Sequence, residues 1–178
     1  MRAAACLQVP DDLVARNRYG ASTIQTTSFP ALPMSLPILP VLPFGQDDHS
    51  YRSAGEEQGI RRLVAHFYEL MDSEPEAAGI RSMHPPDLAS SEDRLWRFLC
   101  GWLGGPKRYH EAYGSISIPR VHAHFPIEAA ERDAWMHCMV LAIEDQPYSN
   151  DFREYLVTQL RVPAERILQA ARLFRAEG

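Results

Sequence analysis

Cysteine is scarce in this sequence: the 178 residues include only Cys6, Cys100 and Cys138, and no two of them have C-x-x-C spacing. An odd number of scattered cysteines supplies neither a disulfide framework nor a zinc cluster. We therefore expect a reducing, cytoplasmic setting.

Long apolar runs and excess positive charge are also lacking. No stretch approaches the ~20 apolar residues of a membrane helix, and the opening MRAAACLQVPDD contains no apolar core of a secretory signal. Acidic residues (23) outnumber lysine and arginine (18), which gives a net charge of −5. Neither nucleic acid nor a membrane is therefore expected as a partner.

The motifs of several enzyme classes are absent too. The chain has no G-x-S-x-G, no Walker loop and no G-x-G-x-x-G, and its acidic residues form no pair at a catalytic spacing. Gly101, Gly104 and Gly105 fit the end of a helix rather than a phosphate cradle. These absences argue against nucleotide-binding enzymes and serine hydrolases.

Proline is abundant in the first part of the chain, at intervals of three or four residues: Pro30, Pro33, Pro37, Pro40 and Pro43. Because proline cannot continue a helix, we expect residues 1–44 to form an extended or disordered arm ahead of a folded domain at 45–178. The arm is interpreted as a passive tail or as a docking site for a proline-reading partner. Met34 is a candidate for the true start of the protein.

Helical periodicity begins after the arm, and no useful period-two alternation is present, so the domain is predicted to be all-α. The first apolar face comprises Ile60, Leu63, Val64, Phe67, Tyr68 and Met71. Pro75 and Gly79 are expected to break this helix. A second helix, capped by Asp87 or Ser90, has a face made of Leu88, Leu95, Phe98, Leu99 and Trp102. Gly104-Gly105-Pro106 should end it.

The remainder is predicted as an irregular segment followed by helices. Residues 107–121 contain the breakers Gly114 and Pro119 and are expected to be irregular, with weak helicity just before His122. A strongly amphipathic helix carrying Trp135 should end near Pro147. The last helical region should begin near Ser149, with a kink or restart at Pro163.

Helical phase separates the seven histidines. His122 and His124 lie two residues apart, so only one of them can face a cofactor. His84 ends a turn between two core-facing helices and is either a loop histidine or a pocket residue. The histidines expected at the surface are His49, His66, His110 and His137.

His122 and Trp135 form a pair that could bind a cofactor. The short link through Phe125-Pro126-Ile127 can direct both rings into one cavity, where the imidazole could ligate a haem iron and the indole could donate a hydrogen bond. Tyr68 lies on an otherwise apolar face, and its buried phenol needs a partner, either a backbone carbonyl or a ligand. On generic grounds a single such histidine is more often a core or surface residue.

Four separated motifs in the same order resemble the group II truncated haemoglobins: HFYELMD (66–72), MHPPDL (83–88), FLCGWLGGPKRY (98–109) and RVHAHFPIEAAERDAWMHCM (120–139). The similarity spans roughly residues 45–145. It implies a globin-like two-over-two helical sandwich around haem b, preceded here by the Pro-rich arm.

The resemblance also implies roles for individual residues. His122 would be the iron ligand, and Tyr68, Trp135 and His84 would form the distal cluster. Leu95 would be the apolar wall over the haem, Ser91 the distal gate and Arg94 the partner of a haem propionate, with Lys107 and Arg108 as weaker candidates. The segment SISIPRVH departs from the family because it keeps only Arg120 of an arginine-rich run.

The expected ligands are dioxygen and other small molecules such as NO, CO or peroxide. Converging O–H and N–H donors favour slow oxygen release, which favours retention, sensing or redox chemistry over diffusive oxygen transport. Nitric oxide dioxygenase or peroxidase-like turnover would need an unidentified reductase. The extension QLRVPAERILQAARLFRAEG is expected to provide packing or homodimer contacts. A haem-free helical interaction module is the competing interpretation.

Overall fold

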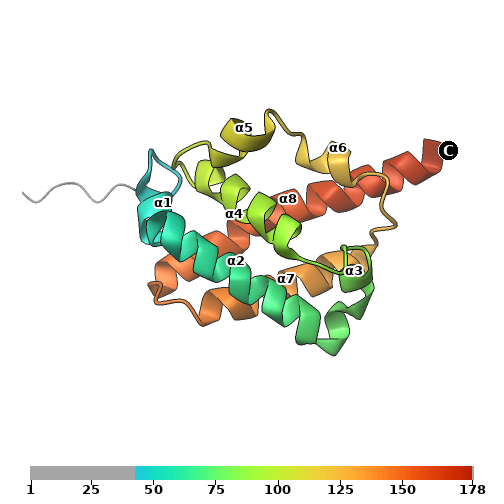
Figure 1. The fold of residues 1–178 in the computed structure, drawn as a ribbon, viewed down its shortest axis with the longest axis horizontal. Helices are drawn as coiled ribbons and strands as arrows, with labels where there is room; N and C mark the ends of the chain where they lie inside the picture. The colour runs from blue at the N-terminus through green and yellow to red at the C-terminus, as the bar shows by residue number, and fades with distance from the viewer. Residues whose placement is uncertain (1–42, 178) are drawn as a thin grey trace, which may run out of the picture. The chain divides into compact units, whose positions relative to one another are not determined.

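The computed structural model describes residues 43–177, and every regular element in this range is helical (Figure 1). The Pro-rich arm lies outside the described residues except for Pro43 and Phe44. The helices are α1 (His49–Ser53), α2 (Glu56–Ser73), the 3-10 helix η1 (Pro75–Ala77), α3 (Ala78–Ser82), α4 (Ala89–Trp102), α5 (Arg108–Tyr113), α6 (Ile118–His122), α7 (Ala129–Glu144) and α8 (Asn150–Glu177).

Two pairs of long helices build the core. Helix α2 packs against α4 and α7, and α7 packs in turn against α8, which confirms the predicted two-over-two sandwich (Figure 1). The largest fully buried side chains between these helices are Leu63, Phe67, Met71, Leu99, Met139, Ile143, Phe152 and Leu156. Phe44 belongs to the folded part, because its ring lies 5.1 Å from those of Phe152 and Tyr155.

The apolar face predicted for α2 is confirmed, since all six of its residues are buried. The helix starts three residues before Gly59. A side chain at residue 59 would place its Cβ 1.9 Å from the Ala54 carbonyl oxygen. Glu74 is extended, as expected before Pro75. Gly79 does not interrupt a helix as predicted, because it lies inside α3.

The apolar face predicted for α4 packs against the core, but the prediction left out one buried residue. Trp96 is only 3% exposed and was missed, whereas Leu95, Phe98 and Trp102 are half-buried. The Trp96 indole N–H donates to Asp93, and the Arg61 guanidinium lies 3.4 Å above its ring centroid. This contact with a residue of α2 cannot be derived from the periodicity of α4 alone.

The end of α4 agrees with the sequence, but its predicted cap was wrong. Leu88 is the N-cap and no side chain caps the helix; Asp87, one residue earlier, accepts from the Ala89 N–H at 2.9 Å, and Ser90 lies inside α4. The helix ends at Trp102, two residues before Gly104, whose φ of 92° is unfavourable for other residues.

Three expectations for the second half need correction. Residues 107–121 are less irregular than predicted: α5 was not expected, whereas α6 is the helicity predicted just before His122, with Pro119 in its first turn, where proline is tolerated. Pro163 does not restart a helix, since it lies inside the 28-residue α8. Helix α7 is not amphipathic but apolar on several sides, because it lies between α2 and α8.

Among the helices of residues 43–177, none combines the length and the apolar character needed to cross a membrane.

Candidate functional site

His122 occupies the last position of α6, and its ring is half-buried. Its Nδ1 lies 2.7 Å from the carbonyl oxygen of Ile118. Because a carbonyl only accepts, Nδ1 carries the proton and the Nε2 lone pair is left for another partner. Burial chiefly lowers the pKa of His122, and the nearby His84 and His124 lower it further, against the opposing bond to Ile118. The ring is therefore neutral at pH 7, the form that binds metals.

His124 lies two residues beyond the end of α6. It is exposed, and its ring packs 4.2 Å from that of Phe125. The half-buried position of His122 and the exposed position of His124 agree with the helical-phase argument.

Tyr68 is buried on α2, with 7% of its surface exposed. Burial raises the pKa of its phenol above the ordinary value, the charge of Glu92 adds to the rise, and the hydroxyl of Ser91 opposes it. The phenol therefore keeps its proton and can donate a hydrogen bond.

His84 completes this part of the cluster. Its ring lies edge-on to Tyr68 with the centroids 5.8 Å apart, and its Nδ1 lies 2.9 Å from the Ile80 carbonyl oxygen. The Nδ1 proton is again fixed by a carbonyl, which leaves Nε2 for another contact. His84 is also close enough to His122 to lower its pKa. Tyr68, His84, Ser91 and His122 therefore lie in one region.

Trp135 joins the cluster from α7. Its half-buried ring lies 5.3 Å from Phe67, and Phe67 lies 4.9 Å from Tyr68. Trp135 is therefore connected to Tyr68 through the ring of Phe67.

Leu95 and Arg94 lie next to each other on α4. Leu95 is half-buried against the core, and the exposed Arg94 lies with its guanidinium 5.4 Å from the ring of Tyr113. Arg108, the weaker candidate for a propionate, is paired with Glu57 and Glu111. Arg94 is therefore the better placed of the two to meet an acidic group.

Asp93 is a local organising residue that sequence reasoning missed. Its carboxylate accepts from Arg97 at 2.8 Å and from the Tyr113 hydroxyl at 2.6 Å, and Arg97 chiefly lowers its pKa. The spacing of Asp93 and Arg97 along one helix could have indicated the first bond. The bond to Tyr113, which ties α5 to α4, had no local signal.

The donor set fits a haem. In residues 43–177 no group of three or more His, Cys, Asp or Glu side chains could hold a metal ion, so iron there would rely on one imidazole and a macrocycle. The neutral imidazole of His122 and the protonated phenol of Tyr68 suit a haem. A hollow of about 310 Å³, bordered by Phe98, Trp102, α5 and Ile116, is lined by neither of these two residues.

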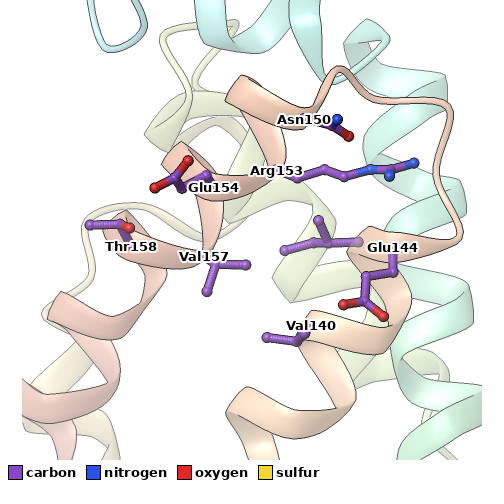
Figure 2. Close-up of a pocket in the computed structure, with 8 residues that line it drawn as sticks. Val140, Glu144, Asn150, Arg153, Glu154, Val157 and Thr158 are labelled. Atoms are coloured by element: carbon purple, nitrogen blue, oxygen red, sulfur yellow. The ribbon is translucent and has the colours of Figure 1, made fainter.

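A larger cavity of about 580 Å³ lies elsewhere, between α7 and α8 (Figure 2). It is lined by Val140, Ile143, Glu144, Asn150, Arg153, Glu154, Val157 and Thr158. None of the predicted site residues borders this cavity.

Comparisons with known proteins agree with this arrangement. The family model for bacterial-like globins matches residues 49–168. The group 2 truncated haemoglobin YjbI of Bacillus subtilis is 32% identical over 118 residues, which cover 66% of this chain and 86% of the relative.

Solved structures give the same result. The group II 2-on-2 haemoglobin of Agrobacterium tumefaciens is 37% identical with a TM-score of 0.64, and the match covers 66% of this chain and 92% of that one. The truncated oxygen-avid haemoglobin of Bacillus subtilis is 31% identical with a TM-score of 0.62, covering 67% and 98% of the two chains. The family-model match over residues 49–168 includes the segment around His122.

Proposed function

The chain belongs to the bacterial-like globin family, whose members bind small ligands such as O2 at a haem iron, and we propose that this member retains dioxygen at a five-coordinate iron. One observation supports this proposal above the others. A neutral His122 with a free Nε2 lies in the same region as the protonated phenol of Tyr68.

The residues that would hold the cofactor come from α4 and α6. His122 would be the iron ligand, Leu95 would cover the distal face of a haem b, and Arg94 would meet a propionate. When bound, the haem supplies a ferrous iron at which dioxygen binds reversibly and gains partial negative charge. The bond from His122 to the Ile118 carbonyl fixes the tautomer and the orientation of the imidazole.

The distal residues would act as hydrogen-bond donors. Because burial raises the pKa of Tyr68, its O–H stays protonated and available to a negatively charged ligand. The N–H of Trp135 would donate from the α7 side, and His84 would orient the phenol through its edge-on contact. Ser91 is too short to reach far and would act as a gate beside Tyr68.

Two convergent donors favour slow release of dioxygen. A hydrogen bond to a charged acceptor contributes about 1.5–3 kcal/mol, so each donor is expected to change release by a factor of about ten or more. The relative from Bacillus subtilis is described as oxygen-avid, which supports the same behaviour here. Retention, sensing or slow redox chemistry is therefore favoured over diffusive transport.

A second candidate uses the same pocket. Nitric oxide dioxygenase or peroxidase-like turnover, with NO or peroxide as substrate, would consume a retained ligand and would require an external reductase. The slow release expected from Tyr68 and Trp135 favours this candidate over a rapidly exchanging carrier.

The test of the iron ligand is a pair of substitutions. His122→Ala should abolish the normal haem absorption spectrum of the purified full-length protein, whereas His124→Ala should leave it almost unchanged. CO binding to the reduced protein should be lost with the spectrum. A normal spectrum in His122→Ala, or its loss in His124→Ala, would contradict the assignment.

A further inference from the structure

The last part of α8 extends beyond the region that the globin family model matches. The match ends at residue 168, and α8 continues to Glu177. Helix α8 packs against α6, the short helix that ends in His122, and its last turns run on past α6 to the C-terminal end (Figure 1). We refer to residues 169–177 as the C-terminal brace.

A small apolar group underlies the brace. Ala171 is fully buried and Leu168 is 1% exposed, while Ile127, in the link between α6 and α7, is 8% exposed. These residues are buried but lie outside the main core cluster between α2, α4, α7 and α8. Ile127 is therefore buried outside the central core, and the bond from Arg175 to its carbonyl oxygen places it next to α8.

Two arginines of the brace bind the same link. Arg175 donates to the carbonyl oxygen of Ile127 at 3.3 Å and to the carboxylate of Glu128. Arg172 forms a second ion pair with Glu128 at 3.6 Å. The N–H of Glu128 is held by Glu131 at 2.9 Å, so this residue is also fixed to the first turn of α7.

Backbone hydrogen bonds continue from this contact to His122. The Phe125 N–H donates to the His122 carbonyl at 3.1 Å, and the Ile127 N–H donates to the Phe125 carbonyl at 2.8 Å. The Ile127 carbonyl then accepts from Arg175. Three consecutive bonds thus connect the brace to the residue proposed to ligate iron.

We propose that the C-terminal brace positions His122, with Arg175 as the principal positioning residue and Arg172 as its support. The proposal rests on the proposed function, in which His122 ligates the haem iron. It assigns the extension a role in setting the proximal side of the pocket, beyond general packing.

The length of α6 explains why such support is needed. A helix of five residues is far below the length at which an isolated helix is stable in water. Its position must therefore come from tertiary contacts, and the described contacts of α6 with another helix are mainly those with α8. A loosened link would let the imidazole tilt and would weaken its bond to iron.

The size of the effect is modest for each contact. The side chains of Arg175 and Glu128 are 35% and 56% exposed, and exposed ion pairs are weak singly. The hydrogen bond to the Ile127 carbonyl adds to them, since an arginine is a charged donor. Removing both arginines should accelerate haem loss by about 3–10-fold, and removing Arg175 alone should give most of this change.

The experiment uses the full-length haem protein and three measurements. The variants are Arg175→Ala, Arg172→Ala with Arg175→Ala, and Arg175→Lys as the conservative form, with Arg161→Ala as a control at an exposed arginine of α8. The measurements are the rate of haem transfer to excess apomyoglobin, the iron–histidine stretching band of the reduced protein, and amide hydrogen exchange across residues 120–128.

We expect faster haem transfer, a shifted iron–histidine band and faster exchange at residues 120–128 in the alanine variants. Arg175→Lys should recover part of each change, and Arg161→Ala should match the wild type. An unchanged band and unchanged exchange in the double variant would overturn the proposal. Amide hydrogen exchange is measured on the haem-free protein as well as on the haem protein. The brace is therefore tested even if His122→Ala retains haem and thereby contradicts the ligand assignment.

Discussion

Trp135→Phe removes one hydrogen-bond donor from the proposed distal pocket and keeps an aromatic ring in its place. The wild-type ring is half-buried and packs 5.3 Å from Phe67, a contact that a phenylalanine can retain in large part. The fold should therefore tolerate the change at a cost of about 1 kcal/mol or less. What is lost is the indole N–H, the proposed donor to the ligand.

The expected effect on oxygen release follows from the strength of that bond. A hydrogen bond to a charged acceptor contributes about 1.5–3 kcal/mol, and about 1.4 kcal/mol corresponds to a factor of ten. Trp135→Phe should accelerate oxygen dissociation about 10–100-fold. Carbon monoxide release should change less, since this ligand has little negative charge.

Stopped-flow mixing of the oxygenated reduced protein with dithionite measures the dissociation rate. Tyr68→Phe is the matched comparison, because it removes the phenolic O–H and keeps the ring. Since both donors share one acceptor, the double variant should show coupling rather than simple additivity. Unchanged or slower oxygen release in Trp135→Phe, together with acceleration in Tyr68→Phe, would refute the reasoning and reduce Trp135 to a packing residue.

Three further predictions concern stability and are read from chemical unfolding. Hydrogen bonds, first to Asp145 and second to Glu69, raise the pKa of His66 in the folded protein. His66→Gln should therefore lower the free energy of unfolding by up to ~1 kcal/mol below about pH 6.5, and this difference should shrink as the pH rises through the folded pKa. Gly59→Ala should destabilise by about 2 kcal/mol or more, because its Cβ would meet the Ala54 carbonyl at 1.9 Å. Phe152→Ala should cost about 3–5 kcal/mol through the cavity that it leaves in the core.

Each of these has a contrasting outcome. A pH-independent difference for His66→Gln would show that its link to α7 is not ionic. Gly101→Ala is the control for Gly59, since its Cβ would meet Lys107 Cα at an ordinary 3.4 Å and should improve helix stability. Equal effects of the two glycine substitutions would contradict the steric argument. A loss below 1 kcal/mol for Phe152→Ala would contradict its place in the core.

The sequence alone determined the features that depend on local periodicity and local chain chemistry. The six apolar residues of α2 recur at helical spacing, and this pattern predicts their burial without knowledge of any partner. The end of α4 before Gly104 follows from the conformations open to glycine and proline. The half-buried position of His122 and the exposed position of His124 agree with their two-residue separation.

The tertiary structure decided what depends on residues distant in the chain. Helices α5 and α6 are too short to be stable from their own sequence, so their formation reflects the elements packed against them. Continuity of α8 through Pro163 has the same origin, because contacts with α6 and α7 on either part outweigh the lost backbone bond. The hydrogen bond of Arg175 to Ile127 and the cation–π contact of Arg61 with Trp96 join residues that are far apart in the sequence. Only folding brings such residues together, so local sequence patterns cannot predict these contacts.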